Sequence, residues 1–227
     1  MYTPKAYIFD YGGTLDTGGC HWGKVLWHAY QRCRVPVSES QFRLAYVYAE
    51  RMLGRQSIIG PDFTFRQTLQ AKLQLQMECL SLTGYDAAVL SEAYAVASHH
   101  TAHSREVLQQ MAEQYPLVLV SNFYGNIGVV LREFGLSHLF RQVIESALVG
   151  IRKPDPRIFS LGVKTLQLPP CEVMVVGDSV SKDIVPARQA GCQTTWLRGE
   201  QWTDEPVDVS SADRIIDDLS ELTITNH

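Results

Sequence analysis

The sequence predicts an α/β protein in which a doubly wound parallel sheet carries a helical bundle inserted after its first strand. Two patterns predict this fold. Over residues 105–227, short apolar runs alternate with helical segments, as expected for a parallel sheet covered by helices on both faces. Over residues 17–104, apolar positions recur at helical spacing and β-branched runs are few. We therefore expect an α/β core of residues 1–16 and 105–227 and a separate helical domain of residues 17–104.

The first expected strand, residues 5–10, ends at a carboxylate. Its apolar run reaches Phe9 and is followed by Asp10, Tyr11 and the pair Gly12-Gly13. An apolar run of this kind suits a central strand that is covered on both faces, and paired glycines let a ligand approach the backbone. Because open α/β sheets bind ligands at the carboxyl ends of their strands, we expect Asp10 to lie in an active site.

The remaining elements follow from periodicity and from turn residues. The helical insert is expected to be a four-helix bundle, in which a Gly-Pro-Asp break separates the second helix from the third. The insert helices are expected at residues 22–33, 39–53, 65–83 and 91–103. In the core, helices are expected at 105–113, 127–134, 156–166 and 182–190, and strands at 117–120, 143–144, 173–176, 194–197 and 214–216.

Composition excludes several classes of partner. The net charge of −4 and the pI near 6.0 give no electrostatic reason to bind nucleic acid or an anionic membrane. No apolar run approaches the roughly 18 residues that span a bilayer. Because the first expected strand begins within a few residues of the start, we expect no signal peptide. Five scattered cysteines indicate reduced thiols. We expect a cytoplasmic protein, and the sequence does not indicate its oligomeric state.

Four segments resemble, in order and spacing, the motifs of the haloacid dehalogenase-like hydrolases, a superfamily with a Rossmann-like core that consists mostly of phosphatases. The resemblance covers residues 6–197, and the helical insert matches the helical cap of the family. The four segments are Phe9-Asp10-Tyr11-Gly12-Gly13-Thr14-Leu15, the strand end Ser121-Asn122, Lys153-Pro154-Asp155, and Val176-Gly177-Asp178-Ser179-Val180-Ser181-Lys182-Asp183.

The resemblance implies phosphoryl transfer from a small phosphorylated metabolite through an aspartyl-phosphate. Asp10 matches the nucleophile of the family. Ser121, Asn122 and Lys153 match the residues that bind the transferred group, and a lysine and a hydroxyl there would stabilise charge on the phosphate oxygens. The cap is expected to close over the substrate, exclude water and set specificity.

The resemblance also implies a Mg²⁺ cofactor. Asp10 and Asp178 match its carboxylate ligands, and the backbone carbonyl of Gly12 matches a third ligand. Asp183 matches a residue that anchors a metal-bound water or positions its loop. Mg²⁺ prefers oxygen ligands and keeps several waters, so one or two carboxylates suffice to hold it.

One position departs from the phosphatase pattern. The phosphatase branch carries an acid–base aspartate two residues after the nucleophile, where this chain has Gly12. General acid–base catalysis typically contributes about 10²–10⁴-fold, so turnover is in question while metal and phosphate binding are expected to persist. Candidates for a replacement, by residue type, are Asp16, His21 and the histidines at 99, 100 and 103. Asp16 is expected mainly as a cap or turn residue, and the three histidines as a surface near the hinge.

Two other interpretations stay open. Phosphonate-cleaving relatives carry a small residue at the position of Gly12 and form a Schiff base with a cap lysine, for which Lys24 and Lys72 are the candidates. Alternatively, the protein is a catalytically weak binder or regulator that recognises a phosphorylated ligand. Dehalogenation is disfavoured, because the chain retains both Asp178 and Asp183.

Overall fold

The core is a six-stranded sheet in which every neighbouring pair of strands is parallel. The computed structural model describes residues 3–203 and 208–223. The strand order is β3-β2-β1-β4-β5-β6, and each expected strand is present. The strands are β1 (Ala6–Phe9), β2 (Leu117–Ser121), β3 (Gln142–Glu145), β4 (Val173–Gly177), β5 (Gln193–Leu197) and β6 (Arg214–Ile216).

The sheet is doubly wound, because helices cover both of its faces and successive residues of its central strands are buried on opposite sides. In β1, Ile8 packs in one hydrophobic cluster and Phe9 in another, as the alternation of side chains along a strand requires. The Ile8 cluster includes residues of α7 (Arg157–Leu166) and α8 (Val185–Gln189). The Phe9 cluster includes residues of α5 (Ile127–Glu133) and the last turns of α4 (Asp86–Ala112).

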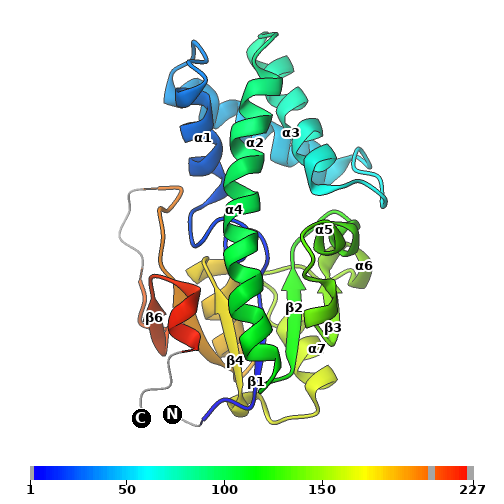
Figure 1. Cartoon of the computed structure of the whole chain (residues 1–227), viewed down its shortest axis with the longest axis vertical. Helices are drawn as coiled ribbons and strands as arrows, with labels where there is room; N and C mark the ends of the chain where they lie inside the picture. Colours follow the sequence, from blue (N-terminus) through cyan, green and yellow to red (C-terminus); the bar gives the residue numbers. More distant parts are fainter. Residues whose placement is uncertain (1–2, 204–207, 224–227) are drawn as a thin grey trace.

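The helical insert stands above the carboxyl ends of the strands (Figure 1). Its second and third helices begin with capping boxes at Ser38 and Thr64, in which side chain and backbone satisfy each other's free groups. The core also contains a short helix, α6 (Ser146–Val149), and a π-helical turn, Val180–Ile184, directly before α8. The sequence had predicted a single helix over residues 182–190 instead. The insert helices are α1 (Trp22–Arg32), α2 (Glu39–Arg55), α3 (Phe65–Leu80) and α4 (Asp86–Ala112).

The fourth insert helix differs from the expectation. Two helices, at residues 91–103 and 105–113, are expected, but α4 is a single helix of 27 residues that runs from the insert down to the sheet (Figure 1). No glycine or proline interrupts it, and Ser104, at the expected break, is buried with its hydroxyl donating to the Leu15 carbonyl at 2.7 Å. The expected boundary between core and insert therefore falls inside a continuous helix.

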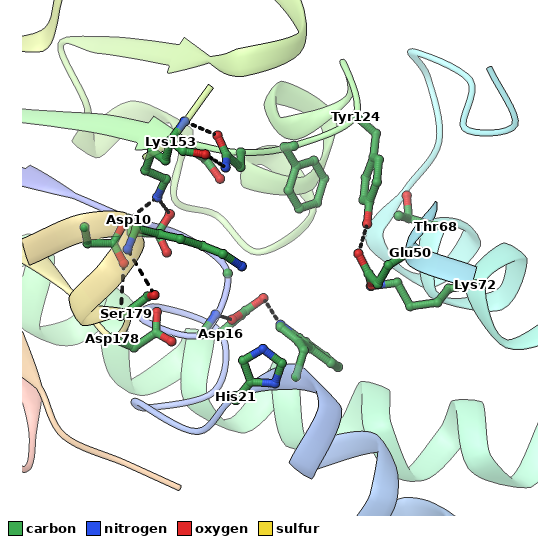
Figure 2. A pocket seen from close by; sticks show the side chains of 18 of the residues that line it. Asp10, Asp16, His21, Glu50, Thr68, Lys72, Tyr124, Lys153, Asp178 and Ser179 are labelled. Carbon is green, nitrogen blue, oxygen red and sulfur yellow. Dashed lines mark hydrogen bonds and ion pairs between the residues drawn. The ribbon is translucent and has the colours of Figure 1, made fainter. Parts of the chain in front are cut away.

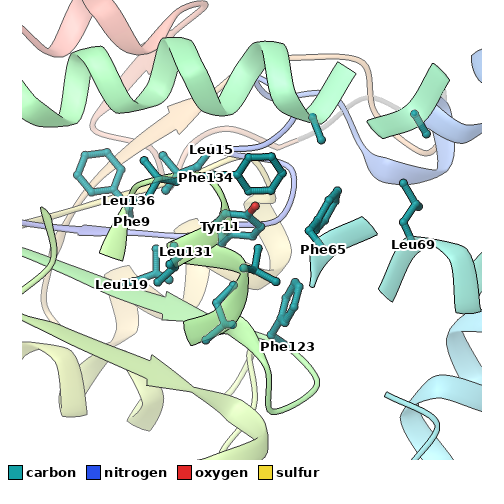
Figure 3. Packing of buried hydrophobic residues seen from close by; sticks show 14 of the residues in the cluster. Phe9, Tyr11, Leu15, Phe65, Leu69, Leu119, Phe123, Leu131, Phe134 and Leu136 are labelled. Carbon is teal, nitrogen blue, oxygen red and sulfur yellow. The ribbon is translucent and has the colours of Figure 1, made fainter. Parts of the chain in front are cut away.

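Insert and core also share one hydrophobic cluster (Figure 3). The ring of Phe65, at the start of α3, packs edge-on against Phe134 of the core with their centroids 5.5 Å apart. Beside these rings, Glu133 accepts hydrogen bonds from the Phe65 backbone at 2.5 Å and from the Tyr94 hydroxyl at 2.8 Å. These contacts hold the insert against the C-terminal end of α5. Within residues 3–203 and 208–223, no helix has the length and apolarity needed to cross a membrane.

Candidate active site

Three aspartates converge at the carboxyl ends of the two central strands. Asp10 directly follows β1, and Asp178 directly follows β4, its neighbour in the sheet. Asp183 lies on the π-helical turn after β4, and it approaches Gly177 so closely that a Cβ there would lie 2.4 Å from the Cβ of Asp183. One carboxylate oxygen from each of the three lies within 4.8 Å of the others, and all three residues are buried. Such a set of oxygen donors fits a hard divalent cation.

Lys153 is the cation that contacts this cluster. Its Nζ lies 2.5 Å from Asp10 Oδ1 and 2.7 Å from Asp183 Oδ1, and its side chain is buried. Asn122 positions its loop, because the Asn122 side chain accepts the backbone N–H of Lys153 at 2.9 Å and donates to its carbonyl at 3.0 Å. Ser121, the buried last residue of β2, lines the same pocket. The expected phosphate-binding residues are thus brought together beside Asp10.

The cluster carries more negative than positive charge. Burial raises the pKa of Asp10 to about 6, although Lys153 opposes the shift. Burial, together with the charges of Asp183 and Asp10, raises the pKa of Asp178 well above its usual range. Although burial alone would lower the pKa of Lys153, its two carboxylate partners raise it, so the ammonium stays charged. Three carboxylates sharing one ammonium favour the binding of an additional cation.

Two residues of the first motif shape the cluster. Gly13 has φ of +100°, and a Cβ there would lie 2.4 Å from Asp178 Oδ2, so only glycine allows this approach. Thr14 Oγ1 donates to Asp178 Oδ1 at 2.9 Å and accepts the Asp178 backbone N–H at 3.0 Å. No role for Thr14 was predicted from the sequence. Its position inside the first motif was the available signal, and only the folded chain brings it to Asp178.

The cluster forms one end of a pocket of about 220 Å³ between the core and the insert (Figure 2). Core residues form the floor, including Gly12, Ser121, Arg152 and Lys182. The opposite wall comes from the insert and includes His21, Trp22, Tyr46, Glu50, Phe65, Thr68, Leu69 and Lys72. Substrate entering this space would contact residues from both parts of the chain.

An ion pair stands on the insert wall. Lys72 Nζ lies 2.6 Å from Glu50 Oε1, and the hydroxyl of Tyr124, from the core, donates to Glu50 Oε2 at 3.3 Å. Although burial acts to raise the pKa of Glu50, the ammonium of Lys72 lowers it below its usual range. Lys24, the other lysine expected as a Schiff-base candidate, lies outside this lining, 3.8 Å from Glu39 and 3.7 Å from Glu200.

Of the candidate replacements for the missing acid, Asp16 and His21 line the pocket. Asp16 is buried, with Oδ1 accepting the Gly13 N–H at 2.7 Å and Oδ2 accepting the Trp22 indole N–H at 2.9 Å. It therefore braces the turn, as expected, and also reaches the pocket. The histidines at 99, 100 and 103 are not among the residues that line it, and His103 instead pairs with Asp218 at 3.0 Å.

Comparison with known proteins decides the family. The sequence profile of the haloacid dehalogenase-like hydrolases matches residues 4–191. This chain belongs to that family. It is therefore a hydrolase, and the family membership expected from its four motifs is confirmed.

The relatives are mainly named as phosphatases. The chain is 26% identical to a phosphoglycolate phosphatase of Vibrio parahaemolyticus over 225 residues, covering 96% of this chain and 94% of that enzyme. It is 38% identical to a phosphoserine phosphatase of Thermus thermophilus over 88 residues, which span only 34% of that enzyme. A solved hydrolase of the same superfamily from Bacillus subtilis, bound to magnesium, shares the fold with a TM-score of 0.60 at 18% identity and 97% coverage of both chains. Dehalogenases share the fold as well.

Proposed function

We propose that this protein is a Mg²⁺-dependent phosphatase that hydrolyses a small phosphorylated metabolite through an aspartyl-phosphate on Asp10. The observation that carries the proposal is the convergence of Asp10, Lys153 and two further buried carboxylates at neighbouring strand ends. A carboxylate nucleophile and a phosphate repel each other, so the reaction requires positive charge between them. The surplus negative charge of the cluster supports a divalent cation as the source of that charge.

Mg²⁺ would be held by Asp10, Asp178 and the Gly12 carbonyl, with Asp183 beside them. When bound, it would neutralise charge on the phosphate and on the nucleophile. Thr14 supports this role because its hydroxyl fixes one oxygen of Asp178.

The residues of the chain divide the first step between them. An Asp10 carboxylate oxygen would form a bond to phosphorus as the ester P–O bond breaks. Lys153, already 2.5 Å from Asp10, would contact a phosphate oxygen and the nucleophile together. The Ser121 hydroxyl would donate to a second phosphate oxygen, and Asn122 would keep Lys153 in place through its two hydrogen bonds to the Lys153 backbone. Water would then cleave the aspartyl-phosphate and release phosphate.

The pocket supports a small, hydrophilic phosphate ester as substrate. Its volume of about 220 Å³ leaves room for a short organic group beyond the phosphate, and Glu50, Lys72 and Thr68 offer that group polar contacts. The match along nearly the whole chain to a phosphoglycolate phosphatase agrees with a substrate of this size.

The ion pair on the insert wall favours ester hydrolysis over phosphonate cleavage. A Schiff base requires a lysine that can lose its proton. Lys72 is the candidate that lines the pocket, and although burial acts to lower its pKa, Glu50 raises that pKa well above its usual range. Lys72 therefore stays charged and suits substrate binding.

Phosphate release from a panel of phosphate monoesters and one phosphonate, with Mg²⁺ and with chelator, tests the proposal. We expect turnover of monoesters that requires Mg²⁺ and that is lost in Asp10→Asn. Absence of turnover across both activated and natural esters would contradict the proposal and favour a protein that binds a phosphorylated ligand. Turnover of the phosphonate alone would favour the phosphonate-cleaving alternative.

A further inference from the structure

The first observation concerns the empty space at Gly12. A Cβ at this position would meet no atom within 4 Å, and Gly12 is not among the glycines with positive φ. The backbone therefore accepts an ordinary side chain here, pointing into the pocket that Gly12 lines. Neither crowding nor backbone conformation requires glycine at this position. The site has room for a carboxylate at Gly12, and the acid–base role must be met from elsewhere if turnover occurs.

The second observation is that another carboxylate reaches the same pocket from the same loop. Asp16 lies four residues after Gly12 and lines the pocket together with Asp10. Figure 2 shows it between the aspartate cluster and His21. The Gly13 N–H and the Trp22 indole N–H each donate to a different oxygen of Asp16, which fixes the orientation of the carboxyl group. A carboxylate has about four lone-pair positions, so each oxygen keeps capacity to hold a proton.

Several other titratable groups that line the pocket already have partners. Nδ1 of His21 accepts the Gly23 N–H at 3.0 Å and so caps α1. Burial lowers the pKa of His21 to about 4, so its ring is neutral at neutral pH, and the N–H that a neutral imidazole keeps is too weakly acidic to protonate a leaving oxygen. Glu50 is held by Lys72, and Lys153 by Asp10 and Asp183.

We propose that Asp16 supplies the acid–base catalysis that the residue at position 12 cannot supply. This inference rests on the proposed function of the Asp10 site. As the ester P–O bond breaks, its electron pair passes to the leaving oxygen, which takes the proton from the Asp16 carboxyl group and departs as an alcohol. The Asp16 carboxylate then removes a proton from the water that attacks phosphorus. The electron pair of the acyl-phosphate P–O bond returns to Asp10, phosphate leaves, and Asp16 is protonated again.

The environment of Asp16 suits both halves of this cycle. Burial raises its pKa to about 7, against the hydrogen bonds from Gly13 and Trp22 that favour its charged form. A group with such a pKa is present in both protonation states near neutral pH, which is the condition for an efficient acid–base catalyst.

The test compares Asp16→Asn with the native protein on two substrates. Phenyl phosphate has a leaving group that needs a proton, whereas para-nitrophenyl phosphate has one that leaves unprotonated. For Asp16→Asn we expect steady-state turnover of phenyl phosphate to fall by about 10²–10⁴-fold. We expect para-nitrophenyl phosphate still to give a rapid burst of one nitrophenolate per active site, because the phosphoenzyme forms but is not cleared.

A second variant separates catalysis from a structural role. In the double variant Gly12→Asp/Asp16→Asn, the new carboxylate points into open space beside the nucleophile. We expect it to recover at least about tenfold of the lost turnover, since acid–base catalysis is worth more than this. If Asp16 only stabilised the turn through its hydrogen bonds to Gly13 and Trp22, the turn would stay disrupted in the double variant, and a carboxylate at position 12 would not restore turnover.

Opposite results would overturn the inference. One such result is that Asp16→Asn turns over phenyl phosphate at a rate within about twofold of the native rate. The other is that Asp16→Asn loses both the burst and steady-state turnover, and that the double variant recovers neither. If Asp16→Asn does not fold, the native protein decides: a shallow dependence of kcat/KM on the leaving-group pKa supports an internal acid, and a steep one contradicts it. Native protein that hydrolyses neither ester in an Asp10-dependent way overturns the proposed function as well, whereas active native protein with an unaffected Asp16→Asn overturns this inference alone.

Discussion

The two ends of the pocket contain the same kinds of charged group in different proportions. At the core end, the buried carboxylates of Asp10, Asp178 and Asp183 share the ammonium of Lys153. At the insert end, one carboxylate, Glu50, pairs with one ammonium, Lys72. Burial raises the pKa of Asp10 despite Lys153, whereas Lys72 lowers the pKa of Glu50 despite burial.

The difference shows which end needs a ligand to complete its charge. Burying carboxylates is costly unless each is paired. The insert end meets this condition by itself and is ready to bind a substrate by hydrogen bonds and charge. The core end does not pair each of its carboxylates, and a bound divalent cation would supply the missing positive charge. Under the proposed function, the chemical step takes place at the core end and the insert end selects the substrate.

The largest expected effect is that of removing the nucleophile. Asp10→Asn should lower Mg²⁺-dependent phosphate release by more than about 10³-fold, because the amide cannot form the acyl-phosphate. Steady-state phosphate release from para-nitrophenyl phosphate measures it. Asp217→Asn is the matched control: this exposed aspartate pairs with Arg198 on the surface and should change activity by less than about twofold. Equal activities would show that Asp10 is not the nucleophile.

Of these variants, the one that removes Lys153, the ammonium shared by the buried carboxylates, should have the largest effect on stability. Lys153→Met leaves the buried carboxylates without their ammonium and should lower the free energy of unfolding by about 3–5 kcal/mol in the absence of metal. Mg²⁺ should restore part of the loss. Chemical denaturation with and without Mg²⁺ measures both effects. Lys5→Met removes an exposed lysine paired with Glu172 and should cost less than about 1 kcal/mol; a similar loss in both variants would remove the distinction between buried and exposed pairs.

The next largest expected effect is a pH dependence of Mg²⁺ binding at the core end of the pocket. The pKa of Asp10 is raised from 3.8 to about 6, so between these values the folded protein binds more protons than the unfolded chain. Its metal-free stability should therefore fall as pH rises through this window. Protons compete with Mg²⁺ for the same oxygens, so Mg²⁺ should stabilise the protein by about 2–3 kcal/mol at saturating concentrations near pH 7.5 and by much less near pH 5.

Thermal unfolding at the two pH values, with and without Mg²⁺, measures this effect. Na⁺ at matched ionic strength controls for general screening. Equal protection at both pH values would contradict binding at the aspartate cluster.

The smallest expected effect lies at the insert end. Lys72→Met should raise KM by about tenfold with a smaller change in kcat, because Lys72 would contact the substrate away from the reacting phosphate. Initial-rate kinetics on the preferred ester measure the two constants. Arg32→Met removes a surface cation of the insert that pairs with Glu92 and should leave both constants unchanged. A fall in kcat at constant KM would place Lys72 in the chemical step instead.

Much of the core end could be predicted from the sequence. Apolar runs specify buried strands, and the carboxyl ends of neighbouring parallel strands lie at one edge of the sheet. The strand pattern therefore predicts that Asp10, Ser121 and Asp178 lie at one edge of the sheet, and the resemblance implied that Lys153 joins them. The resemblance then supplied the reaction class, and the family match confirms that the protein is a hydrolase.

The insert end could not be predicted in the same way. Helical spacing shows that one side of a helix is buried, but it does not show whether that side meets another helix or a pocket. Lys24 and Lys72 looked equivalent in the sequence, yet Lys72 lines the pocket and Lys24 does not. The expected break near Ser104 was wrong for a related reason, because a run without glycine or proline carries no local signal of where a helix passes from one packing environment to another.

The sequence by itself determined the order of the strands along the chain, the fold class and the residues that meet at the strand ends, because local apolar patterns and parallel pairing are sufficient for these. Only the tertiary structure decided that α4 spans both parts of the molecule, that Glu50 pairs with Lys72, and that Asp16 reaches the pocket beside the open space at Gly12. Each of these depends on which side chains meet across segments distant in sequence, and that is set by how the whole interior packs.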